Sequence, residues 1–166
     1  MGKNIASKNI KIKKIYTIFP RIIKLSLAIF SLMALFIGGL IYLQYRPHNL
    51  LMFSWLRHLN LEQFFPQHFL NNPNKIKDFC IFSLPNGLWL LSILILFGLI
   101  WNNSRKIFYL YSIIFLFVNL LFEILQFFLI ISGTFDLADF ITLIIAFFIG
   151  MLIYELIIRS LYEKKC

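Results

Sequence analysis

The sequence predicts an all-α membrane protein with four transmembrane helices, and three properties of the chain lead to this fold class. Of its 166 residues, 60% are hydrophobic and only 14% are charged, which leaves too few polar side chains to cover a water-soluble domain. The apolar residues form continuous runs instead of alternating with polar ones, which favours helices over strands. Each run is close to the roughly 20 residues that a helix needs to cross a bilayer.

The predicted spans cover about residues 22–42, 84–101, 107–131 and 140–158. A basic segment, residues 1–21, precedes the first span. The residues after this span lack the small-residue motif of a signal-peptide cleavage site, so the span is interpreted as a retained anchor. Pro85 fits the first turn of the second span, where its missing N–H costs nothing. The third span is the longest and is expected to tilt or project. Residues 22–166 therefore form one membrane domain.

The connection between the first two spans, residues 46–83, is too long for a plain turn. It mixes leucine, phenylalanine and tryptophan with polar residues, which is typical of a helical segment that lies in the headgroup layer. We expect it to cover the outer face of the bundle.

The basic residues predict the orientation of the chain. Of the sixteen Lys and Arg residues, twelve precede the first span or open it, lie between spans two and three, or follow span four; the other four lie in residues 46–83. The positive-inside rule then places both termini in the cytoplasm, for a multi-pass protein of the cell (cytoplasmic) membrane. The net charge of +9 is explained by this topology, so a lipid bilayer is the expected partner and nucleic acid is not.

Glu123 is the strongest candidate for a functional residue. Counting back from Ile131 places it about 12 Å inside the outer end of the third span, where a carboxyl group costs about 2.5–3.5 kcal/mol unless it faces partners in the bundle. Asn119, Glu123 and Gln126 share one helix face. The alternative is a structural polar seam, in which the two amides bond to a protonated Glu123 and to neighbouring helices.

Asp136 and Asp139 precede or open the fourth span. They have a structural interpretation: Asp136 caps the helix, Asp139 interacts with the positive end of its dipole, and Gly133 ends the third span. Together with Glu123, however, they bring three carboxylates to the outer half of a small bundle. Such a group suits a divalent cation, a cationic headgroup, or acid–base chemistry on a lipid-linked substrate.

The fourth span also carries two patterns at helical spacing. Its small or packing residues recur every four positions, at Thr142, Ala146, Gly150 and Tyr154, which predicts close helix packing. Glu155 and Arg159 are four apart near the inner boundary and are expected to form a local pair.

At these residues the sequence resembles the VanZ-like family of small bacterial membrane proteins. The resemblance is carried by Glu123-x-x-Gln126, Gly133-Thr134-Phe135-Asp136-x-x-Asp139, Gly150, the Leu84–Trp89 segment and the Arg46–Trp55 segment. The chain departs from the family at Leu143 and Ala146, where Asn and Gly are common. The namesake is associated with low-level resistance to teicoplanin, a lipid-bearing antibiotic that acts at the outer face of the cytoplasmic membrane. The resemblance therefore implies a function at the cell envelope.

Three functional hypotheses follow. In the first, an outward-facing acidic pocket binds or modifies an envelope lipid or lipid-linked glycan, with Glu123 as acid/base or ligand, Gln126 orienting it, and Asp136 and Asp139 at the rim. In the second, a non-enzymatic accessory protein docks a membrane partner or a second copy through its small-residue face. A transporter ranks last, because four spans are few and no broken-helix repeat is visible. The sequence leaves open whether there is catalysis.

Overall fold

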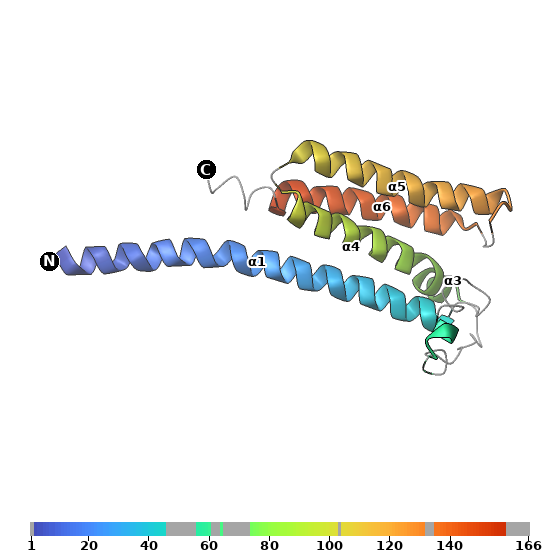
Figure 1. The fold of residues 1–166 in the computed structure, drawn as a ribbon, viewed down its shortest axis with the longest axis horizontal. Helices are drawn as coiled ribbons and strands as arrows, with labels where there is room; N and C mark the ends of the chain where they lie inside the picture. Colours follow the sequence, from blue (N-terminus) through green and yellow to red (C-terminus); the bar gives the residue numbers. More distant parts are fainter. Residues whose placement is uncertain are drawn as a thin grey trace.

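The computed structural model of the chain is a bundle of four long helices, with no β-strand among the residues that it describes (Figure 1). These are residues 2–45, 56–60, 64, 74–102, 104–131 and 135–158, with the backbone alone described for residues 2–20 and Lys75. The predicted headgroup-layer segment lies mostly outside the described residues. The predicted fold class is confirmed, because four helices are long and apolar enough to cross a membrane.

The elements follow the predicted order of spans. They are α1 (Gly2–Tyr45), α3 (Lys75–Asp78), the π-helical turn η2 (Phe79–Ser83), α4 (Leu84–Ile100), α5 (Arg105–Phe127), α6 (Leu137–Ile153) and the π-helical turn η3 (Tyr154–Ile158). The parts able to span a membrane are Arg21–Tyr45, Ile76–Ile100, Arg105–Phe127 and Leu137–Ile158. The protein is therefore multi-pass, with apolar helices suited to a lipid bilayer.

The second span begins at Ile76, earlier than predicted, because α3 and η2 continue directly into α4. In a regular α-helix, the ring of Pro85 would meet the carbonyl four residues earlier. Here a wider turn precedes it, in which the Leu84 N–H bonds to the carbonyl of Phe79, five residues back. The helix can therefore extend past the proline that was expected to open it.

The third span ends at Phe127 instead of Ile131. Leu129 has a left-handed φ of 56°, its N–H bonds to the Gln126 carbonyl, and the Ile130 N–H bonds to the Leu125 carbonyl. This pairing is a Schellman motif, which terminates a helix. An apolar sequence pattern shows no break here, which explains why the prediction ran too far.

The helices lie side by side in the order α1, α4, α6, α5 (Figure 1). The chain runs in alternating directions, so α4 and α6 are parallel to each other and antiparallel to α1 and α5. We call the end where α5 stops and α6 begins the acidic end, after Glu123, Asp136 and Asp139. The opposite end, where α5 begins with Arg105 and Lys106, is the basic end.

The small residues of α6 form its contact with α4. A Cβ atom added at Gly150 would lie 2.7 Å and 2.9 Å from side-chain atoms of Leu94, so only glycine fits there. Leu94 also belongs to a buried cluster with Leu90, Leu143 and Ala146. The packing role predicted for the small residues is thus confirmed. The opposite faces of the helices expose large apolar side chains such as Phe117 and Phe148, as a lipid environment requires.

Candidate functional site

The acidic end is built from the start of α4, the last turns of α5 and the start of α6. Asp139 lies in the first turn of α6 with only 3% of its surface exposed. The amide Nδ2 of Asn86, in the first turn of α4, donates a hydrogen bond to Asp139 Oδ2 over 3.2 Å. A carboxyl group and an amide from two different helices therefore meet inside the bundle.

Sequence reasoning gave Asn86 no role in the site. A signal was present, because Asn86 carries the only amide side chain between Leu84 and Trp101. A solitary amide in an apolar span is expected to bond to another helix. Its partner could not be identified from the sequence, since Asp139 lies 53 residues further along the chain.

Glu123 is buried on α5, with 6% of its surface exposed, and lies four residues before the end of the helix. It is therefore about 6 Å from that end, not the 12 Å expected, because the helix stops early. Ring contacts fix the register of α5 against α6, pairing Phe108 with Tyr154 and Phe127 with Phe135. Since the helices are antiparallel, this register places Glu123 level with Asp139. The two buried carboxyl residues thus occupy one level of the bundle.

The two predicted neighbours of Glu123 differ in what they contact. Asn119 uses its amide within its own helix, donating to the Phe115 carbonyl at 2.8 Å. Gln126 is half-buried, one turn closer to the end of α5. Of the two amides, Gln126 is therefore the one placed toward the acidic end.

Asp136 has a different role from the two buried acids. It is exposed and is the N-cap of α6, with Oδ1 accepting a hydrogen bond from the Ala138 N–H at 2.8 Å. Such a cap satisfies one of the backbone donors that a helix start leaves without a partner. The capping interpretation of Asp136 is confirmed. Gly133, expected to end the third span, lies outside the described residues.

A divalent cation needs several oxygen ligands grouped around it. Among the described residues, which include Glu123, Asp136 and Asp139, no three His, Cys, Asp or Glu side chains are grouped so that they could hold one. The acidic end is better described as a buried pair of carboxyl residues with an amide than as a three-carboxylate metal site.

The small-residue face of α6 is already covered by α4. Thr142, Ala146, Gly150 and Tyr154 are all buried within the chain. A Cβ atom at Gly87 of α4 would come within 2.5 Å of the Thr142 methyl group, which shows how closely the two helices approach. This face is therefore part of the internal packing.

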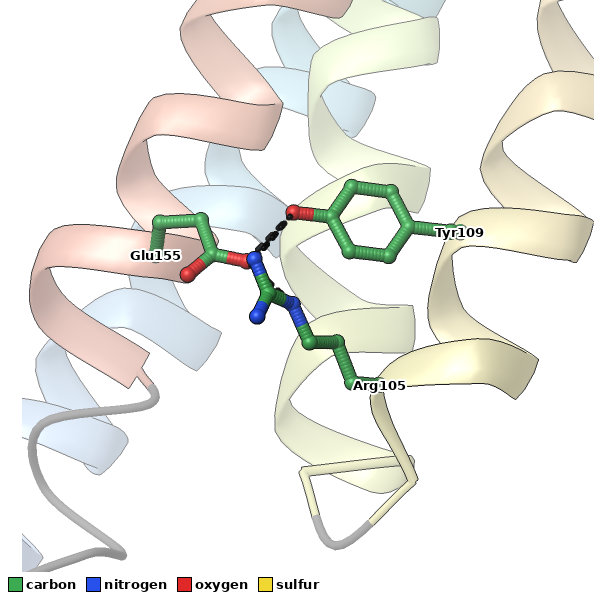
Figure 2. A network of polar contacts seen from close by, with 3 residues as sticks. All are labelled: Arg105, Tyr109 and Glu155. Atoms are coloured by element: carbon green, nitrogen blue, oxygen red, sulfur yellow. Dashed lines mark hydrogen bonds and ion pairs between the residues drawn. The ribbon is translucent and has the colours of Figure 1, made fainter.

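A second polar cluster lies at the basic end (Figure 2). Arg105 Nε lies 3.1 Å from Glu155 Oε1, and the Tyr109 hydroxyl donates a hydrogen bond to the same oxygen. The Arg105 guanidinium also lies over the Tyr109 ring, 5.4 Å from its centre. The sequence suggested Arg159 as the partner of Glu155; Arg159 lies outside the described residues, so this pairing stays a prediction. Among the described residues, Arg105 pairs with Glu155.

Comparison of the chain with protein-family models, curated proteins and solved structures gave no match. The site must therefore be interpreted from its own residues and contacts.

Proposed function

We propose that the protein binds the polar headgroup of an envelope lipid or lipid-linked glycan at its acidic end. The observation that carries this proposal is the burial of Glu123 and Asp139 at one level of the bundle, close to where the helices end. Buried carboxyl groups are costly in a membrane, and their retention is typical of a ligand or substrate pathway. A headgroup at the membrane surface can reach this depth.

The orientation supports a ligand on the outside of the cell. Arg105 and Lys106 lie at the basic end, on the side toward which the N-terminal part of α1 extends (Figure 1). The positive-inside rule assigns this end to the cytoplasm, and the acidic end to the exterior. This is the side on which the VanZ-like resemblance implies a function, since teicoplanin acts there.

Cysteine labelling tests the orientation. Cys80 is exposed on η2 near the acidic end, and the chain's second cysteine is Cys166 at the opposite end of the sequence. In a Cys166→Ser variant, a membrane-impermeant maleimide is expected to label Cys80 in intact cells. In a Cys80→Ser variant, Cys166 should react only after lysis. The reverse pattern would place the acidic end in the cytosol and remove the proposed site.

The function is tested by expressing the chain in a teicoplanin-sensitive host and measuring survival, with membrane accumulation followed by immunoblot. Glu123→Gln and Asp139→Asn are expected to abolish protection at unchanged accumulation. Glu155→Gln is the matched control, because Glu155 belongs to the basic end. Lipids that copurify with each variant are identified by mass spectrometry. Loss of both protection and bound lipid supports binding; normal protection and lipid content in all three variants would contradict it.

The same variants separate binding from modification of the ligand. A glutamine keeps the hydrogen-bonding shape of Glu123 but cannot transfer a proton. If Glu123→Gln retains the copurified lipid yet loses protection, the site acts chemically on its ligand. If lipid and protection are lost together, binding accounts for the phenotype.

The alternative of an accessory protein that docks a partner through its small-residue face has less support. That face is packed against α4, so a partner helix would have to displace α4 before it could bind.

A further inference from the structure

Ser83, at the junction of η2 and α4, carries a buried hydroxyl that the fold does not use. Its side chain is fully buried, and its Oγ makes no hydrogen bond to any residue that the structure describes. A buried hydroxyl that makes no hydrogen bond destabilises the fold, because it has lost its hydrogen bonds to water. Such an atom needs an explanation, and a bound ligand is one.

Other buried serine and threonine hydroxyls in the described helices have partners. Ser92, Ser112 and Thr142 each donate to the backbone carbonyl four residues earlier, over 2.6–2.7 Å, and Ser31 donates to the Ser92 carbonyl of α4. For Ser83 the corresponding carbonyl belongs to Phe79, and in the π-helical turn this carbonyl accepts the Leu84 N–H. The wider turn therefore changes the backbone around Ser83, and its hydroxyl does not make the bond that Ser92, Ser112 and Thr142 make. Single π-helical turns of this kind occur frequently at functional sites.

The position of Ser83 on the helix points it toward the acidic site. Residues four apart share a helix face, and Gly87, four residues after Ser83, packs directly against Thr142 of α6. Because α4 and α6 are parallel and Asn86 meets Asp139, Ser83 is level with the first turn of α6. The turn η2 also contacts α6. Ser83 therefore lies beside the Asn86–Asp139 pair.

The polar atoms of this site are mainly hydrogen-bond acceptors, so they suit a ligand that donates hydrogen bonds. Carboxylate oxygens accept, the Asn86 carbonyl oxygen accepts while its Nδ2 is engaged by Asp139, and a serine hydroxyl can do either. The basic residues nearest to Ser83 in the sequence are Lys75 and Lys77 of α3, and the Lys77 side chain is exposed. An anionic group would be repelled by the carboxylates of Glu123 and Asp139, whereas a protonated primary amine brings a positive charge and three N–H donors.

We propose that Ser83 contacts the ligand directly at the acidic end, and that the ligand presents a protonated primary amine. This inference rests on the proposed function and completes its site with Ser83, Asn86, Glu123 and Asp139. An aminophospholipid and an amino sugar on a lipid-linked glycan share this amine. Both present it at the membrane surface, where the site lies.

Native mass spectrometry of the full chain in nanodiscs tests the amine. One set of nanodiscs contains phosphatidylethanolamine, the other phosphatidylcholine with the same acyl chains, both diluted in phosphatidylglycerol. Choline keeps the positive charge but has no N–H donor, so the protein should retain phosphatidylethanolamine about tenfold better. Displacement by excess glucosamine, but not by N-acetylglucosamine, would identify the amino sugar as the preferred source. Equal retention of both phospholipids, without displacement by glucosamine, would overturn the amine assignment.

The role of Ser83 is tested by Ser83→Ala in the same assay. We expect about tenfold weaker retention of phosphatidylethanolamine with no loss of thermal stability, because the hydroxyl has no partner among the described residues to lose. Ser92→Ala is the matched control: Ser92 is equally buried, but its hydroxyl bonds to its own helix. Wild-type retention by Ser83→Ala would overturn the assignment of Ser83. The proposed function would still stand if Glu123→Gln and Asp139→Asn lost the lipid, and would fail if they kept it together with protection.

Discussion

The two ends of the bundle hold their acidic side chains in opposite ways. At the basic end, Glu155 is 27% exposed by side chain and has a guanidinium nitrogen 3.1 Å away and a phenol on the same oxygen. At the acidic end, Asp139 is 3% exposed and accepts a hydrogen bond from the neutral amide of Asn86. At the basic end a guanidinium and a phenol bind the carboxylate, whereas at the acidic end a neutral amide binds it.

This difference bears on what each end is for. An ion pair near the water boundary contributes about 0–1 kcal/mol to stability, and its two charges satisfy each other. A carboxyl group buried in a membrane costs more than that, so stability alone does not account for Glu123 and Asp139. The comparison therefore favours a packing role for the basic end and supports the proposal of a ligand at the acidic end.

The largest effect is expected from a substitution that damages both ends at once. Gly150 is the point at which α6 touches Leu94 of α4, and α4 and α6 run from one end of the bundle to the other. Gly150→Leu forces these helices apart and should destabilise the fold by about 1–3 kcal/mol or more. Gly39→Leu is the control, because a Cβ atom there meets nothing within 4 Å. Thermal unfolding in detergent measures both variants.

Lipid retention by Gly150→Leu extends this test. Because the α4–α6 contact also aligns Asn86 with Asp139, the variant should lose bound phosphatidylethanolamine along with its stability. A Gly150→Leu protein as stable as Gly39→Leu would contradict the close packing. A destabilised protein that keeps its lipid would show that the acidic end forms independently of the α4–α6 contact.

A test at Asp136 distinguishes a helix-capping residue from a binding-site residue within the acidic end. Asp136→Ala removes the acceptor for the Ala138 N–H and should cost about 1 kcal/mol of unfolding free energy. Asp136→Asn retains a capping oxygen, so it should unfold like the wild type and retain lipid equally well. Loss of lipid in Asp136→Asn with wild-type stability would show that the carboxylate belongs to the binding site.

The contrast between local and distant contacts also explains what the sequence could predict. The spans, the cap at Asp136 and the packing residues of α6 depend on neighbours within one or two turns, so their spacing is visible in the chain. Asn86 and Asp139 lie on different helices and are 53 residues apart in the chain. The sequence around a solitary polar residue does not show which distant residue it will bind. Arg105 looked like one more orientation charge until the fold placed it beside Glu155.

Backbone detail was the other part beyond prediction. The π-helical turn at Phe79–Ser83 and the Schellman motif after Phe127 depend on which carbonyl each N–H selects, while the apolar pattern is the same either way. Both features lie at the acidic end. The Schellman motif places Glu123 closer to the helix end than predicted, and the π-helical turn contains Ser83, whose hydroxyl has no partner among the described residues. The backbone that was hardest to predict therefore shapes the candidate site.

The smallest effect is expected at the basic end, where it tests whether that end serves stability alone. Glu155→Gln removes the charge that binds Arg105, whose side chain is 56% exposed, so solvent screening limits the expected loss to about 0.2–1 kcal/mol. A double-mutant cycle with Arg105→Gln isolates the coupling between the two side chains, and Lys106→Gln controls for the loss of one basic charge. Lipid retention should be unchanged in every member of the cycle. A coupling energy near zero would show that the pair does not hold α5 to α6, and a change in retained lipid would show that the two ends are not separate in function.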